Sequence, residues 1–86
     1  MKDKIKILKS ISDETRLKII SLLLGGEKCV CEIFPKVDRA QPTVSLQLKK
    51  LEEADILEKR KDGRRIFYKI KDERIKEILK ILENGG

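Results

Sequence analysis

The chain has 86 residues, of which 40% are hydrophobic and 42% are charged, and its net charge is +6. This length predicts one domain with a small core, and the positive excess favours a polyanionic partner, of which DNA is the commonest. Histidine is absent, so the usual general base and metal ligand are missing and an enzyme is the least favoured class of protein.

Two helices are predicted in the N-terminal third of the chain. Residues 4–11 carry isoleucines and leucine near helical spacing, which indicates a short first helix. Ser12 and Asp13 are both residue types that cap helix N-termini. The strongly apolar helix that follows them should end at Gly25-Gly26 and lie at the centre of the core.

Two more helices are predicted before the middle of the chain. Residues 29–37 show helical spacing of apolar side chains, but Pro35 limits the length of this third helix. Residues 41–53 predict a fourth helix with Pro42 at its start, a position that suits proline. Its buried stripe consists of Val44, Leu48 and Leu51.

The C-terminal half predicts a β-hairpin and a closing helix. In residues 56–70 the side chains alternate between two faces, as on β-strands, and the segment contains Asp62-Gly63, a pair typical of tight hairpin turns. Residues 72–83 form the last helix, and residues 84–86 are expected to be a frayed tail. The whole chain, residues 1–86, is therefore predicted to be one mostly α domain with a β-hairpin wing, a winged helix-turn-helix.

The fourth helix and the hairpin together predict a DNA-binding surface. A major groove admits one helix, whose facing side needs small polar and hydrogen-bonding groups, and glutamine can pair with adenine through both its amide atoms. Flanking lysines and arginines would bind phosphates. The candidate DNA contacts are Arg39, Gln41, Thr43, Ser45, Leu46, Gln47, Lys49, Lys50, Lys61, Arg64 and Arg65. The alternatives are a solvated helix face, a charged sheet edge, or the surface ion-pair networks of a hot-adapted protein.

Four stretches of the chain resemble one known family. They are DETRLKII at 13–20, EKCVCEI at 27–33, QPTVSLQLKKL at 41–51 and the pair Phe67-Tyr68 at the end of the wing. Together they resemble the ArsR/SmtB metalloregulators, and among these the arsenical-resistance repressors. The resemblance implies a DNA-binding repressor that leaves its operator when a metal or metalloid ion binds.

The resemblance also implies a homodimer whose first and last helices form the interface. A small core favours dimerisation for independent reasons, and a dimer predicts double-stranded operator DNA with an inverted repeat. The candidate interface residues are Ile5, Leu8, Ile75, Ile78, Leu79 and Leu82. Packing of the last helix within one subunit is the alternative.

The chain departs from the family at several positions. Arsenic-sensing members carry a third cysteine where this chain has Phe34, and zinc-sensing members use histidines that it lacks. Ala40 replaces a capping serine before the fourth helix, and Asp55 replaces the usual glycine after it. Asp55 should still adopt the left-handed cap conformation. The resemblance to the family therefore supports DNA binding more strongly than it identifies the inducer.

Cys29 and Cys31 are the candidate inducer ligands. We expect reduced thiols in a cytoplasmic protein, close to a helix N-terminus that favours the thiolate. On a regular helix their side chains would point about 200° apart, so holding one ion would require the turn to unwind. No cofactor is required, and the candidate inducers are As(III), Hg(II), Cu(I) and Cd(II). Alternatives are a thiol-redox trigger, a regulator with no small inducer, and cysteines that only fill space.

A third class is a winged domain that contacts RNA or another protein. Aromatic residues make up only 3% of the chain, and no motif for stacking single-stranded bases is visible, which counts against RNA. The sequence also shows neither a phosphate-binding glycine loop nor a nucleophile–base pair, and the lack of these common catalytic features counts against an enzyme.

Overall fold

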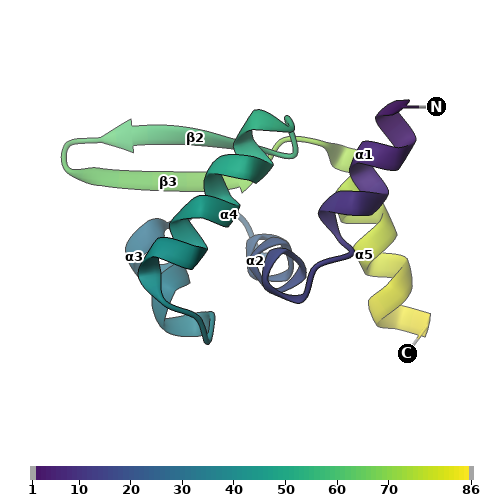
Figure 1. Cartoon of the computed structure of the whole chain (residues 1–86), viewed down its shortest axis with the longest axis horizontal. Coiled ribbons are helices and arrows are strands. Elements are labelled where there is room, and N and C mark those ends of the chain that lie inside the picture. Colours follow the sequence, from purple (N-terminus) through teal and green to yellow (C-terminus); the bar gives the residue numbers. More distant parts are fainter. Residues whose placement is uncertain (1, 86) are drawn as a thin grey trace.

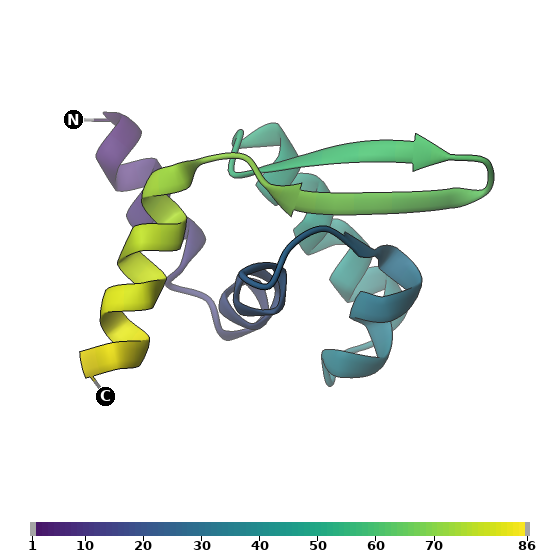
Figure 2. The same ribbon diagram turned by 180° about the vertical axis from the view of Figure 1, so that it is seen from behind.

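The computed structural model describes the backbone of residues 2–85 and the side chains of residues 2–83. Along this part of the chain the elements are α1 (Lys2–Ser10), α2 (Glu14–Leu23), β1 (Lys28–Cys29), α3 (Val30–Ile33), the 3-10 turn η1 (Phe34–Lys36), α4 (Gln41–Glu53), β2 (Leu57–Asp62), β3 (Arg65–Ile70) and α5 (Glu73–Gly85). Figures 1 and 2 show α1 and α5 side by side at one end of the molecule, with the β2–β3 hairpin and α3 at the other. The predicted mostly helical domain with a hairpin wing is confirmed.

The helix α2 lies at the centre of the core, as predicted. Asp13 is its N-cap, because the carboxylate accepts a hydrogen bond from the Arg16 backbone N–H at 3.0 Å. Ile19 and Ile20 have no exposed surface. They pack among buried side chains contributed by α3, α4, the sheet and α5, so one helix anchors the elements on both sides of it.

The sheet has one strand more than the sequence predicted. The two residues of β1 pair antiparallel with β3, Lys28 opposite Tyr68 and Cys29 opposite Phe67, giving the order β1-β3-β2. A two-residue strand is too short to show alternation, so no pattern could reveal it. The predicted third helix consequently starts at Val30, and it is divided into α3 and η1 near Pro35.

The hairpin turn and the end of α4 both need left-handed backbone, and they use different residues. The register of the hairpin places Asp62 opposite Arg65, so the two-residue turn is Gly63-Arg64, one position later than predicted. Gly63 has φ +62°, a conformation that costs glycine little. Asp55 has φ +59° directly after α4, which confirms the predicted cap.

The last helix differs from the prediction at its end. Asn84 and Gly85 were expected to be frayed, but α5 continues through them, and residue 86 lies outside the described residues. None of the helices within residues 2–85 has the length and apolar character needed to cross a bilayer.

Candidate nucleic-acid interface and thiol pair

The helix α4 presents a polar face to solvent. Its buried side is formed by Val44, Leu48 and Leu51, as predicted. The predicted DNA contacts that are exposed on its other sides are Gln41, Thr43, Ser45, Leu46, Lys49 and Lys50. The two hydroxyl groups are therefore accessible, and Leu46 keeps half of its surface in solvent, 50%. Ala40 forms no side-chain cap, so the first N–H groups of α4 can meet a phosphate.

Gln47 is the exception on this helix. It is half-buried, and its side-chain oxygen accepts a hydrogen bond from Arg16 Nη1 at 3.1 Å. The same guanidinium donates to the backbone oxygens of Ser10 at 3.3 Å and Lys9 at 3.1 Å. Pairing with adenine through both amide atoms requires this oxygen, so the predicted bidentate contact of Gln47 does not fit the structure. Gln47 instead connects α4 to the junction of α1 and α2.

The predicted phosphate-binding cations differ from the lysines and arginines that form salt bridges on the surface. Within the described residues, no salt bridge involves Arg39, Lys49, Lys50, Lys61, Arg64 or Arg65. By contrast, Lys59 pairs with Glu52 and Lys69 pairs with Glu58. Surface ion-pair networks therefore account for part of the charge but not for this group, whose charges remain available to phosphates.

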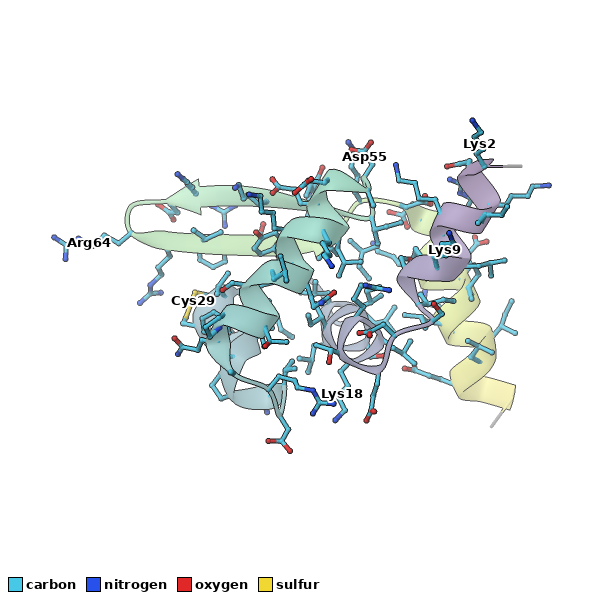
Figure 3. All side chains as sticks on the ribbon, viewed as in Figure 1. Lys2, Lys9, Lys18, Cys29, Asp55 and Arg64 are labelled. Carbon is cyan, nitrogen blue, oxygen red and sulfur yellow. A yellow bond between two sulfur atoms is a disulfide. The ribbon has the colours of Figure 1, made fainter. Side chains whose placement is uncertain are left out.

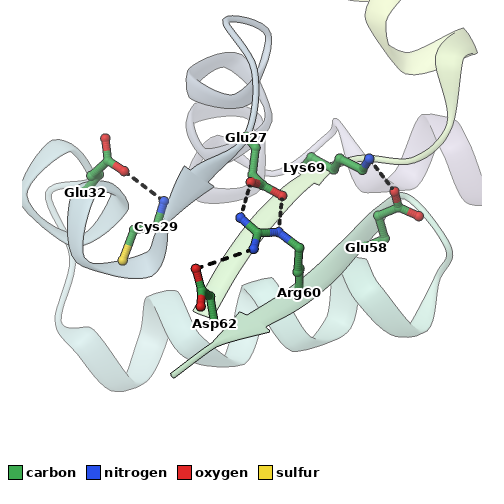
Figure 4. Close-up of polar contacts among 7 residues, drawn as sticks. All are labelled: Glu27, Cys29, Glu32, Glu58, Arg60, Asp62 and Lys69. Atoms are coloured by element: carbon green, nitrogen blue, oxygen red, sulfur yellow. Dashed lines mark hydrogen bonds and ion pairs between the residues drawn. The ribbon is translucent and has the colours of Figure 1, made fainter. Parts of the chain in front are cut away.

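The base of the wing is held by ion pairs. The Arg60 guanidinium donates to both carboxylate oxygens of Glu27, at 3.2 and 2.7 Å (Figure 4). It also lies 4.5 Å from the centre of the Phe67 ring. This guanidinium holds the pKa of the Glu27 carboxyl below its ordinary value. The contact joins residues 33 positions apart in the sequence, so no local pattern could have indicated it. It fixes the hairpin to the segment that leads into β1.

The tip of the wing projects away from the body of the protein. Arg64 lies at the turn and points beyond it (Figure 3). Lys61 and Arg65 are exposed on either side of the turn. A cationic tip of this kind can reach a DNA backbone or a minor groove that lies beside α4, the candidate recognition helix.

The two cysteines lie side by side at the start of α3. Cys29 is the N-cap, with φ −67° and ψ 145°, and its sulfur accepts a hydrogen bond from the Cys31 N–H at 3.3 Å. The Glu32 carboxylate accepts from the Cys29 N–H at 2.9 Å, completing a capping box (Figure 4). The Cα atoms are 5.1 Å apart and the sulfurs are joined as a disulfide.

This geometry corrects two expectations about the thiols. They were expected to point apart and to be reduced, but Cys29 has extended backbone rather than helical backbone, so its sulfur turns toward Cys31. The helix therefore need not unwind to bring the sulfurs together. Cys29 is buried, at 4% exposed, whereas Cys31 is exposed.

An open groove of about 610 Å³ runs beside the thiol pair. Phe34, which stands where arsenic-sensing family members carry a third cysteine, lines it together with Gln41 from the start of α4 and Arg64 and Arg65 from the wing. Among the described residues no group of three or more histidines, cysteines or carboxylates could hold a metal ion. The described part of one chain therefore supplies two sulfur ligands at this place.

The predicted dimer face is partly wrong. Ile75 and Leu79 are buried within the single chain, at 0% and 2% exposed. They belong to the subunit's own core, because they are part of its cluster of buried hydrophobic side chains. Ile78 is half-buried. The large apolar side chains that remain exposed on α1 and α5 are Ile5, Leu8, Ile81 and Leu82, which we call the terminal apolar strip. Ile81 was missing from the predicted set.

The known proteins that this chain resembles in sequence include transcriptional regulators and repressors. A family model described as "bacterial regulatory protein, arsR family" matches residues 13–59. An uncharacterized HTH-type transcriptional regulator of Methanocaldococcus jannaschii is 43% identical over 91% of this chain and 89% of its own length. An arsenical resistance operon repressor of Staphylococcus aureus is 36% identical over 88% of this chain and 73% of its own length.

Solved structures agree with the sequence relatives. The transcriptional repressor BigR from Xylella fastidiosa has a TM-score of 0.91 and 30% identity, covering 96% of this chain and 85% of that one. A homodimeric winged helix-turn-helix DNA-binding domain from Mycobacterium bovis has a TM-score of 0.83 and 26% identity, covering 95% of this chain and 76% of that one. The winged helix-turn-helix assignment is confirmed.

Proposed function

This chain belongs to the ArsR family of bacterial regulatory proteins, and we propose that it is a repressor that binds an inverted-repeat operator as a homodimer and leaves it when Cys29 and Cys31 react. It is a DNA-binding transcriptional regulator rather than an enzyme. The operator form, the interface and the inducer are the proposed parts, and each has its own support.

The exposed face of α4, together with the cations at the wing tip that form no salt bridge within the described residues, is the observation that carries DNA binding. Thr43 and Ser45 are accessible there, and small hydroxyl side chains allow a helix backbone to approach base edges closely. Leu46 can contact a thymine methyl group. The unpaired cations on both sides of α4 are placed to neutralise phosphates on either side of one major groove.

The terminal apolar strip supports the homodimer. Exposed Leu8 and Leu82 lie on two helices at the same end of the molecule (Figure 1), and burying them against a second copy would remove apolar surface from water. An isologous dimer presents two copies of α4 related by a two-fold axis. Its half-sites should be about 34 Å apart, one helical turn, or a multiple of that.

The thiol pair supports a response to two-coordinate soft ions or to oxidation. Two adjacent sulfurs fit Hg(II) or Cu(I), whereas As(III) or Cd(II) needs further ligands, and Phe34 occupies the position where a third thiol would stand. The two sulfurs lie where they can be joined as a disulfide, so oxidation of the reduced pair is a second candidate trigger. Cys29 pairs with Phe67 in the wing strand β3, so a rearrangement at this residue reaches the wing directly.

Footprinting on the DNA upstream of the chain's own gene tests the proposal. We expect protection of two half-sites in inverted orientation, and release after addition of Hg(II), Cu(I) or an oxidant. Arsenite, Cd(II) and Zn(II) should release the protein less completely at equal concentration. Protection of a single half-site would contradict the dimer, and absence of protection would contradict operator binding.

Replacing Arg64 with alanine tests the wing. We expect binding to weaken by a similar factor for the operator and for unrelated DNA, and the slope of log K against log salt to become shallower by about 1 per lost phosphate contact. Fluorescence anisotropy over a salt series measures both. Lys18→Ala is the control, because Lys18 pairs with Glu14 on α2 at 3.7 Å. A change in sequence preference alone would mean that Arg64 contacts bases instead.

A further inference from the structure

The first helix carries a row of lysines that DNA binding by α4 and the wing does not use. Lys2, Lys6 and Lys9 are exposed and follow the spacing i, i+4, i+7, so they share one face of α1. Ile5 and Leu8, which belong to the terminal apolar strip, lie on the neighbouring face. The lysine row of α1 (Lys2, Lys6 and Lys9) therefore remains open when that strip is covered by a second copy.

The lysine row borders a shallow cationic pocket. Lys6 and Lys9 of α1, Arg16 of α2 and Lys50 of α4 surround a floor of Leu51 and Ala54, in a volume of about 200 Å³. None of the residues that line this pocket is acidic. Four positive groups around one apolar floor create a local potential that attracts an anion.

Within the part of the chain that the structure describes, the lysines at this pocket have no partner of opposite charge. Lys6, Lys9 and Lys50 form no ion pair with any residue that the structure describes, whereas Lys71 pairs with Asp55 at 3.3 Å and Lys76 with Glu73 at 3.3 Å. Like charges at i, i+3 and i, i+4 destabilise a helix. A row of this kind lowers the stability of α1 unless an anion covers it.

The pocket and the recognition helix share one face of the molecule. Both α1 and α4 lie on the near side in Figure 1 and on the far side in Figure 2, and Lys9 points to the viewer in Figure 3. Arg16 fixes their relative position, because it binds Gln47 of α4 and the Lys9 carbonyl at the end of α1, each at 3.1 Å.

We propose that Lys6, Lys9 and Lys50 form a second phosphate site, which takes a phosphodiester of the operator backbone between the two half-sites. This inference rests on the proposed dimer on DNA, because α1 then lies beside the two-fold axis and faces the centre of the operator. The phosphates that it reaches flank the central minor groove. Lys50, which the sequence predicted as a phosphate contact of α4, belongs to this site. The contribution of Lys6 and Lys9 is independent of base sequence and adds to that of α4 and the wing.

The double variant K6Q/K9Q tests the site. If each protomer loses one phosphate contact, the dimer loses two, so the salt slope becomes shallower by about 1.8 and operator affinity near 0.15 M salt falls on the order of 30-fold. The matched control is K18Q/K76Q, which removes the same charge from two ion-paired lysines. Thermal melting of both variants checks that they fold.

Neutral methylphosphonates at the central phosphates of the operator identify the partner. They should weaken wild-type binding and leave K6Q/K9Q binding almost unchanged, because the variant has already lost that contact. Inorganic phosphate, titrated at fixed ionic strength, tests a free anion as the ligand instead.

Equal losses in K6Q/K9Q and K18Q/K76Q, or methylphosphonates that affect wild type and variant alike, would overturn the site. Competition by inorganic phosphate without any methylphosphonate effect would overturn the operator as its ligand. If the wild-type protein binds no upstream DNA, operator binding itself fails, and the central site fails with it. If the wild-type protein binds the operator and K6Q/K9Q binds it equally well, the central phosphate site is rejected while operator binding stands.

Discussion

Replacing Leu82 with glutamate is expected to lower operator affinity at least about 100-fold, because it places a charge in the surface that joins two protomers. Leu82 is 57% exposed in the single chain, so the subunit should fold with glutamate there. Burying an unpaired carboxylate in a dimer interface costs several kcal/mol, and each 1.4 kcal/mol is a factor of ten in the association constant. A monomer would then contact only one half-site.

Sedimentation of the free protein and anisotropy on the operator measure the two effects of L82E. The contrasting variant is Leu79→Ala, which removes a side chain that is 2% exposed within one chain. Its expected effect is a loss of about 2–5 kcal/mol in the free energy of unfolding, with dimerisation of the folded fraction preserved. If L82E remained dimeric and L79A became a folded monomer, the assignment of these two positions would be reversed.

These two leucines also mark the limit of what periodicity can predict. Ile75, Ile78, Leu79 and Leu82 form one helical stripe in the sequence, and the stripe correctly predicts α5. Spacing specifies which side chains share a face, but it does not specify what covers that face. The structure divides the stripe, because Ile75 and Leu79 belong to the core of the single chain whereas Leu82 is exposed.

Local chemistry predicted several helix ends well. Asp13 caps α2 and Asp55 ends α4 in left-handed backbone, because both depend on residues within a few positions of the helix end. The hairpin turn was displaced by one residue, since an Asp-Gly pair fixes the presence of a turn more firmly than its register.

Contacts between segments that are far apart in the chain could not be predicted from the sequence. Glu27 and Arg60, or Arg16 and Gln47, meet only after the helices and the wing have packed. The candidate site likewise combines local features that could be predicted with long-range contacts that could not. The exposed face of α4 follows from helical spacing, whereas the lost amide oxygen of Gln47 follows from a side chain on another helix. The pairing of the thiols depended on one backbone angle at Cys29, which the helical pattern assigned wrongly.

Serine at Cys31 is expected to abolish release from the operator while leaving operator affinity within about twofold, as exposed substitutions usually do. A response to Hg(II) or to disulfide formation needs both sulfur atoms, and this variant has only one of them. Titration of the operator complex with Hg(II) and, separately, with an oxidant measures the loss. Far-UV circular dichroism checks that α3 is retained.

Serine at Cys29 provides the informative partner variant, because it tests the buried sulfur without removing the helix cap. Serine is among the preferred N-cap residues, and its hydroxyl oxygen can accept from the N–H groups at the start of α3, as the Cys29 sulfur does from Cys31. Both variants should therefore fold, and both should fail to respond if the two sulfurs act together. Loss of response in C31S alone would indicate oxidation of the exposed thiol by itself. Full release in both variants would exclude the thiols as the trigger, and it would leave the α4 surface as the functional site with its signal arriving from elsewhere.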